Sequence, residues 1–107
     1  MVEESVIKKV KKFVDILKRK GIRIDKIILY GSYVRGNPRG ESDIDVAVIS
    51  RDFGKDRTEE GMTLFRIAGD VDPRIEPIPI SLKSYEEDTW LPLIYEIRTK
   101  GVEIKGY

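Results

Sequence analysis

Cysteine and histidine are both absent from the 107 residues of the sequence. Without cysteine the chain has no disulfide, no thiolate zinc site and no cysteine nucleophile. Without histidine it has no imidazole that could act as a general acid or base or ligate a metal. These two absences exclude several classes of catalysis and of metal binding.

An excess of positive charge is also lacking, since 20 lysines and arginines face 19 aspartates and glutamates and leave a formal net charge of +1. No overall basic field is available to hold a nucleic acid backbone, which argues against a processive polymerase and against nucleic acid as a direct partner. No long apolar run and no secretory leader occur, so we expect a cytoplasmic protein without membrane contact. The 40% hydrophobic and 36% charged residues are typical of one soluble globular domain.

The most informative stretch is 27–36, with the sequence IILYGSYVRG. Its apolar, β-branched start predicts a buried strand. Gly31 follows, where the chain must turn sharply or come close to a ligand, and Ser32 opens a short helix. A Gly-Ser turn of this kind offers backbone N–H groups and a hydroxyl to phosphate oxygens.

Two aspartates begin the next predicted strand, which runs to Ile49. Asp43 and Asp45 are two positions apart, so both carboxylates leave the same face, about 7 Å apart along the backbone. Two acids at the start of an apolar strand need a partner or the open end of a sheet, because burying them unpaired is costly. Paired carboxylates are the kind of ligand that Mg²⁺ takes, together with substrate phosphates.

Together, the turn and the acid pair predict metal-dependent phosphoryl or nucleotidyl transfer. Each half alone is more often an ordinary turn or a pair of solvated acids. Gly-Ser, ten residues and then Asp-x-Asp occur in that order here. From average residue usage, a chain of this length should contain that combination by chance only about once in a thousand.

The signature of the DNA polymerase beta-like nucleotidyltransferase superfamily resembles two segments of the chain, GSYVRG at 31–36 and SDIDV at 42–46. The short length is similar to the minimal nucleotidyltransferase subgroup. The resemblance implies an α+β fold, with one domain over residues 1–107 and a mixed β-sheet whose helices pack mainly on one face. Members of the subgroup are commonly antitoxin partners of helical HEPN-domain toxins, which implies such a partner here.

The superfamily also uses a third carboxylate from a neighbouring strand, which completes a metal site and can act as general base. Residues 74–80 predict a third strand, and its two prolines favour an edge or bulged path. Glu76 on this strand is the expected third acid, with Asp72 as the alternative and Asp70 just ahead of it. The family most often has aspartate here, so the longer glutamate leaves the metal count and the rate open.

The loop between the two site strands carries two arginines. Arg35 lies three residues after Ser32, about one helical turn, so its guanidinium is a candidate to reach a triphosphate. Arg39 is the second candidate, and a solvated surface arginine is the alternative for each. We assign no catalytic role to Ser42, which can bond the loop backbone instead.

Elsewhere, helical periodicity predicts a scaffold helix over 3–20, closed by Gly21, and a second helix over 56–71. We expect Asp56 and Glu59 to cap the second helix and place Met62, Phe65 and Ala68 on its apolar face. An apolar stripe follows Pro92, and 102–104 predicts a short last strand. Three aromatic residues, Tyr85, Trp90 and Tyr95, lie near this apolar stripe. We expect them to seal the core; the alternative is that they form a partner-binding patch.

The predicted function is Mg²⁺-dependent transfer of a nucleoside monophosphate, AMP from ATP in the first place, to a hydroxyl acceptor. Gly31, Ser32 and Arg35 bind the nucleotide, and one or two Mg²⁺ are held by Asp43, Asp45 and Glu76. The resemblance implies a tyrosine of a HEPN toxin as acceptor. Two alternatives stay open: an antitoxin that acts by docking alone, and a small-molecule nucleotidyltransferase, whose usual extra helical domain these residues lack. A homo-oligomer is compatible with each.

Overall fold

The computed structural model describes residues 3–34 and 43–107. Its elements, in chain order, are α1 (Glu4–Arg19), β1 (Lys26–Tyr30), the short 3₁₀ turn η1 (Gly31–Tyr33), β2 (Ile44–Ser50), α2 (Arg57–Val71), β3 (Ile75–Ser81), α3 (Leu82–Glu87), α4 (Pro92–Lys100) and β4 (Val102–Ile104). Within these described ranges, every helix is too short or too polar to cross a membrane.

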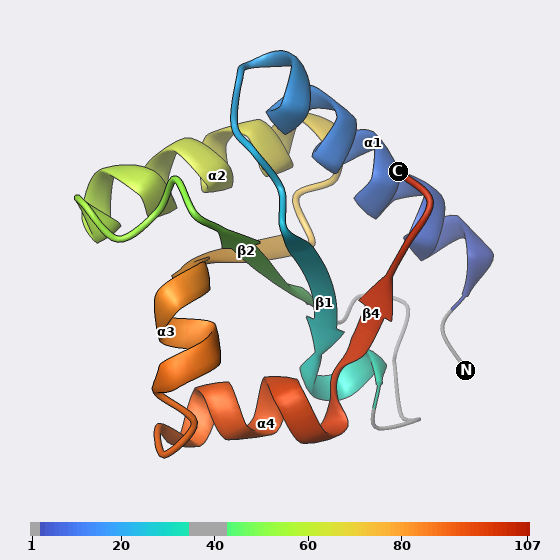
Figure 1. Ribbon diagram of the computed structural model, residues 1–107. Coiled ribbons are helices and arrows are strands. Elements are labelled where there is room, and N and C mark those ends of the chain that lie inside the picture. Colours follow the sequence, from blue (N-terminus) through green and yellow to red (C-terminus); the bar gives the residue numbers. More distant parts are fainter. Residues whose placement is uncertain (1–2, 35–42) are drawn as a thin grey trace.

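The four strands form one mixed sheet in the order β3-β2-β1-β4 (Figure 1). β1 pairs antiparallel with both β2 and β4, whereas β2 and β3 run parallel. A parallel pair needs a long crossover, which α2 supplies between β2 and β3. As a result, the end of β1 and the starts of β2 and β3 lie at the same edge of the sheet.

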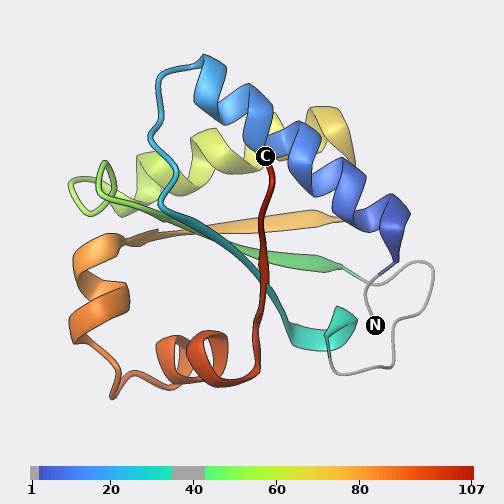
Figure 2. The same cartoon turned by 45° about the vertical axis from the view of Figure 1, so that its right-hand side comes forward.

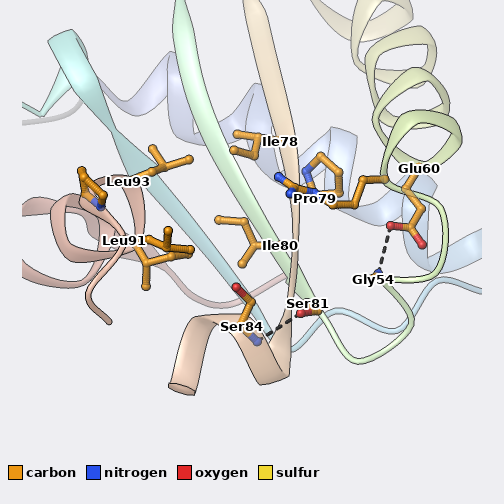
Figure 3. Close-up of a pocket in the computed structure, with 12 residues that line it drawn as sticks. Gly54, Glu60, Ile78, Pro79, Ile80, Ser81, Ser84, Leu91 and Leu93 are labelled. Atoms are coloured by element: carbon orange, nitrogen blue, oxygen red, sulfur yellow. Dashed lines mark hydrogen bonds between the residues drawn. The ribbon is translucent and has the colours of Figure 1, made fainter. Parts of the chain in front are cut away.

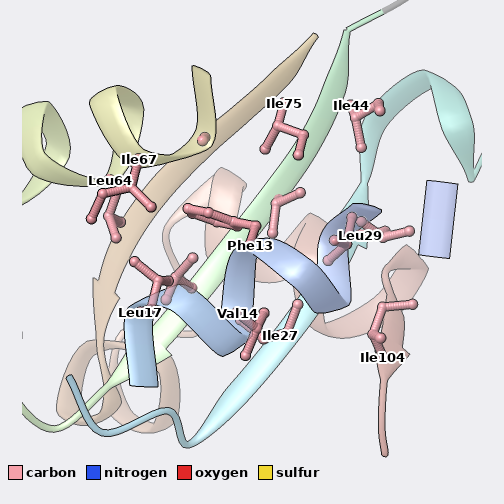
Figure 4. Close-up of a cluster of buried hydrophobic side chains, with 14 of the residues drawn as sticks. Phe13, Val14, Leu17, Ile27, Leu29, Ile44, Leu64, Ile67, Ile75 and Ile104 are labelled. Atoms are coloured by element: carbon pink, nitrogen blue, oxygen red, sulfur yellow. The ribbon is translucent and has the colours of Figure 1, made fainter. Parts of the chain in front are cut away.

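Helices cover the sheet on both faces, with the two longer ones together on one side (Figure 2). α1 and α2 enclose the larger core, in which Phe13, Leu17 and Leu64 meet the apolar residues of the strands (Figure 4). α4 and part of α3 cover a smaller core on the other face, around Ile94 and Ile97. The predicted α+β class, the mixed sheet and the larger helical layer on one face are therefore confirmed.

The boundaries of the two long helices confirm the sequence signals. Two bonds close α1 as a Schellman cap: Gly21 N–H donates to Lys18 at 3.0 Å and Ile22 N–H to Leu17 at 3.1 Å. At the start of α2, the Asp56 carboxylate accepts from the backbone N–H of Glu59 at 3.1 Å. The predicted ends of both helices hold to within one or two residues.

The apolar face of α2 differs from the one predicted from the sequence. Leu64, Ile67 and Ala68 are the buried residues of the helix. Met62 is 66% exposed and Phe65 59% exposed, so the prediction that they face the core is wrong. By helical spacing, Ala68 fits either the predicted or the observed apolar face. The apolar residues before it therefore offer two possible apolar faces of similar quality.

The aromatic residues near α4 correct a second expectation. Trp90 is 75% exposed and Tyr95 60% exposed, so neither seals the core; only Tyr85 packs against the smaller cluster. Ile94 and Ile97 fill that place, because they are the α4 residues that face Ile28 and Ala47 in the same cluster. The prediction of β3 as an edge strand is confirmed, since β3 ends the sheet order.

Candidate functional site

The three segments predicted to form the site meet at one edge of the sheet. In register, Tyr30 at the end of β1 lies opposite Asp45 on β2, and Asp45 lies opposite Glu76 on β3. Residues paired across neighbouring strands extend to the same face of a sheet. Asp45 and Glu76 therefore share the face that α3 and α4 cover farther along the strands, where Ala47 and Ile80 are buried.

Gly31 is where the turn comes closest to Asp45. Its φ is 77°, a left-handed conformation that side chains with a Cβ disfavour. A Cβ built there would clash with Oδ2 of Asp45 and lie 3.2 Å from its Cγ. The sequence expectation for Gly31, a sharp turn or a close approach, is met in both respects: the turn backbone and the Asp45 carboxylate are in direct contact. Ser32, the next residue of η1, is half-buried.

Glu76 is electrostatically coupled to both aspartates. The pKa of its carboxyl is raised by partial burial, then by the negative charges of Asp43 and Asp45, and by a hydrogen bond with the Asp43 carboxylate. Since Glu76 as a residue is exposed, the two neighbouring charges are the more informative cause. The two aspartates and Glu76 thus gather as predicted, whereas their roles as metal ligands stay predictions.

The donor chemistry of this cluster fits a hard divalent cation. Three carboxylates on neighbouring positions supply oxygen ligands, and a cation would relieve the repulsion that raises the pKa of Glu76. Within residues 3–34 and 43–107, however, no group of three acidic side chains is already arranged to hold a metal ion. The residue types and their convergence fit Mg²⁺, and a closed ligand set would require new side-chain rotamers.

Two residues at this edge were not assigned from the sequence. Tyr30 is half-buried, and burial together with the charges of Asp45, Glu96 and Glu76 raises the pKa of its hydroxyl to about 12. Glu96 lies on α4, so this helix brings a further carboxylate toward the cluster. Tyr30 could have been found from its place beside Gly31, but Glu96 could not, because only the packing of α4 brings it there.

Asp72, the alternative third acid, is engaged elsewhere. It is buried and accepts from Lys9 Nζ at 2.9 Å and from Arg74 Nη2 at 3.0 Å. Arg74, followed by Lys9, holds the pKa of this carboxyl well below its usual range. A carboxylate committed to two cations is a poor candidate for a third metal ligand, which favours Glu76.

The predicted nucleotide contact Arg35 lies outside the described residues, and so do the second candidate Arg39 and Ser42. Two cavities of about 330 Å³ lie in the described part of the chain, and neither of these two is lined by the site acids. The first lies between β3, the start of α2 and the α3–α4 region, among Ile78, Ile80 and Leu91 (Figure 3). It shares a sheet face with Glu76 but opens farther along β3.

Comparison with known proteins agrees with this geometry. The family model described as "Polymerase beta, Nucleotidyltransferase" matches residues 11–106. "Putative protein adenylyltransferase MJ0141" of Methanocaldococcus jannaschii is 33% identical over 101 residues, which cover 94% of this chain and 96% of that protein. "Putative protein adenylyltransferase MJ0604" of the same organism is 54% identical over 43 residues, covering 39% of this chain and 43% of that protein.

Two solved structures share the fold. One is a crystal structure of a mutant of the toxin–antitoxin MntA–HpeT, with a TM-score of 0.58 and 23% identity over 91% of this chain and 73% of that one. The other is a toxin–antitoxin structure with AMP-PNP, with a TM-score of 0.61 and 25% identity over 94% of this chain and 73% of that one. The chain belongs to the polymerase beta nucleotidyltransferase family, and within it the predicted resemblance to a minimal nucleotidyltransferase is confirmed.

Proposed function

We propose that the protein transfers AMP from Mg-ATP to a hydroxyl group, and that the acceptor is a tyrosine of a HEPN-domain toxin whose antitoxin it is. The observation that carries the proposal is the contact between the Gly31 turn and the Asp45 carboxylate, with Glu76 in register beside it. Phosphate and metal ligands need to lie side by side for this chemistry. The similarity to protein adenylyltransferases and to a toxin–antitoxin structure with AMP-PNP supports it.

The roles follow from the positions of the residues. The backbone at Gly31 and Ser32 would hold the nucleotide phosphates, and Arg35 would add a charge to them. Asp43 and Asp45, with Glu76, would hold Mg²⁺, which supplies charge neutralisation on the phosphates. Glu76 would take the proton of the acceptor hydroxyl. The hydroxyl oxygen then bonds to the α-phosphorus, the bond from that phosphorus to the bridging oxygen breaks, and pyrophosphate leaves.

Exposed apolar side chains beyond the site support a protein partner. Trp90 is 75% exposed and Leu93 38% exposed, and they lie in the short segment that leads into α4 and at its start. Large aromatic residues at the surface are enriched in the centres of protein interfaces. The same observation favours the second candidate function, an antitoxin that neutralises its partner by docking alone.

Incubation with ATP labelled on the α-phosphate, Mg²⁺ and a HEPN-domain protein encoded beside this chain tests the proposal. We expect label on a tyrosine of the partner, and no label with the Asp43→Asn/Asp45→Asn variant. The Asp15→Asn/Asp70→Asn variant is the matched control, since it removes two exposed carboxylates outside the site and should label as wild type. Label on a free small molecule would instead indicate the small-molecule alternative.

A complex that forms without label transfer would contradict the catalytic proposal and favour docking alone. A Trp90→Ser/Leu93→Ser variant then separates binding from catalysis. Trp90 is largely exposed but Leu93 is only 38% exposed, so we expect the variant to lower the free energy of unfolding by about 1 kcal/mol and to stay folded. Its affinity for the partner should fall, whereas Mg-ATP binding should not change; an unchanged partner affinity would place the interface elsewhere.

A further inference from the structure

A chain of polar contacts runs behind the Gly31–Tyr33 turn, on the sheet face covered by α1 and α2. Lys9 of α1 and Arg74 both bind the buried Asp72, at 2.9 Å and 3.0 Å. The other side of the Arg74 guanidinium donates from Nη1 to the hydroxyl of Tyr33 at 3.1 Å. Tyr33 is only 2% exposed and the Arg74 side chain 28% exposed, so this bond is partly buried.

Arg74 contacts each of the three segments that build the site. Its side chain holds Tyr33, the last residue of the turn. Its carbonyl accepts from the backbone N–H of Ile44 at 2.7 Å, and Ile44 is the residue between the two site aspartates. Glu76 follows Arg74 two positions along the chain. One residue thus connects the turn, the aspartates and the glutamate.

The Arg74 side chain is itself held in a fixed orientation. Asp72 accepts from the backbone N–H of Arg74 at 2.8 Å and from both Nε and Nη2 of its guanidinium. A guanidinium held on one edge by a carboxylate presents its remaining N–H groups in a defined direction. The remaining N–H group at Nη1 points to the Tyr33 hydroxyl and gives this buried oxygen a hydrogen-bond partner.

We propose that Arg74 is a positioning residue that, through Tyr33, fixes the Gly31–Tyr33 turn relative to the site carboxylates. The inference rests on the proposed function, since it assigns the turn to nucleotide phosphates. Arg74 acts from the opposite face of the sheet from Asp45 and touches no substrate. It sets the position of the turn backbone, and that position determines how tightly the nucleotide binds.

Three variants test the inference by Mg-ATP affinity. Tyr33→Phe removes the hydroxyl and keeps the buried ring; Arg74→Lys keeps a cation for Asp72 but cannot bind Asp72 and Tyr33 with one rigid fork. We expect each to weaken Mg-ATP binding about three- to tenfold, the size of effect that the loss of one typical hydrogen bond would have. In the double variant the losses should not add, because both changes break the same contact.

Arg51→Gln is the matched control. Arg51 binds Asp25 as Arg74 binds Asp72, through its backbone N–H at 2.8 Å and Nη2 at 2.6 Å, at the far end of the sheet. It should leave Mg-ATP affinity unchanged. If Tyr33→Phe and Arg74→Lys bind Mg-ATP as wild type does, or if Arg51→Gln weakens binding equally, the inference is wrong.

A second measurement does not depend on the nucleotide. The Val34 N–H donates to the Gly31 carbonyl across the turn at 3.2 Å. We expect its hydrogen exchange to be faster in Tyr33→Phe and Arg74→Lys and unchanged in Arg51→Gln; unchanged exchange in all three would refute the positioning role. A wild-type protein that binds no Mg-ATP would contradict the proposed function, and the exchange rates would still decide whether Arg74 holds the turn.

Discussion

Gly31→Ala is the substitution whose effect the structure specifies most closely. It introduces two separate penalties. The first is conformational, because φ at Gly31 is 77°, and an L-residue in the left-handed region costs about 1–2 kcal/mol. The second is steric, because the new methyl group would overlap Oδ2 of Asp45 and lie 3.2 Å from its Cγ. Relief of that overlap requires a strained Asp45 rotamer, at about 0.5–1.5 kcal/mol.

Gly21→Ala provides a control with only the first penalty. Its φ is 86°, and a Cβ there would meet no atom within 4 Å. We therefore expect Gly31→Ala to lower the free energy of unfolding by about 1.5–3.5 kcal/mol and Gly21→Ala by about 1–2 kcal/mol. Mg-ATP affinity should fall in Gly31→Ala alone, since only that variant displaces the Asp45 carboxylate.

Urea unfolding followed by circular dichroism measures these losses, and a double-mutant cycle isolates the contact with Asp45. In an Asp45→Ala background the Oδ2 and Cγ atoms are gone, and Cβ of residue 45 stays at an ordinary 3.5 Å. The cost of Gly31→Ala should then drop to that of Gly21→Ala. Equal costs of Gly31→Ala with and without the carboxylate would refute the reasoning about close approach.

Three further predictions concern other parts of the fold. Asp72→Asn should cost about 1.5–3 kcal/mol at pH 7, because it weakens the charged hydrogen bonds to Arg74 and Lys9, whose side chains are only partly buried. Since Arg74 lowers the pKa of Asp72, the wild-type advantage should be present above the ordinary carboxyl pKa and decline as pH falls below about 4, in urea unfolding from pH 3 to 7. Glu76→Gln should raise the urea midpoint of the metal-free protein at pH 7 and change it less at pH 4, where a carboxyl with a raised pKa is already neutral; equal shifts at both pH values would contradict this. Pro77→Val/Pro79→Val should promote self-association in light scattering, because it gives edge strand β3 two new N–H donors, whereas Pro92→Ala should not.

The strands and the convergence of the three acids could be predicted because their signals are local. Period-two alternation along β2 places Ala47 and Ile49 on the face of Asp45 and Val46 on the other, and the two cores divide them in that way. The prolines of β3 identified an edge strand, since proline cannot donate in a sheet interior. The close approach of Gly31 followed from the conformational freedom of glycine.

What could not be predicted depends on contacts between distant residues. Trp90 was expected to be buried because it is large and apolar, but Ile94 and Ile97 already fill the space beneath α4. Likewise, the sequence alone leaves Asp72 open as the alternative third acid, because its pairing with Lys9, 63 positions away, is visible only in the structure. Arg74 carried no motif at all, and its role is visible only in three dimensions.

The burial of β2 on both faces has a consequence for how this site can change over time. Each residue of this strand from Val46 to Ile49 packs into one core or the other. A shift of the strand by a single position would bury Asp45 among the apolar side chains beneath α1. Burial of this unpaired carboxylate would unfold the protein. Mutation can therefore erase the acids of this family member while the scaffold survives, but it cannot relocate them along the strand.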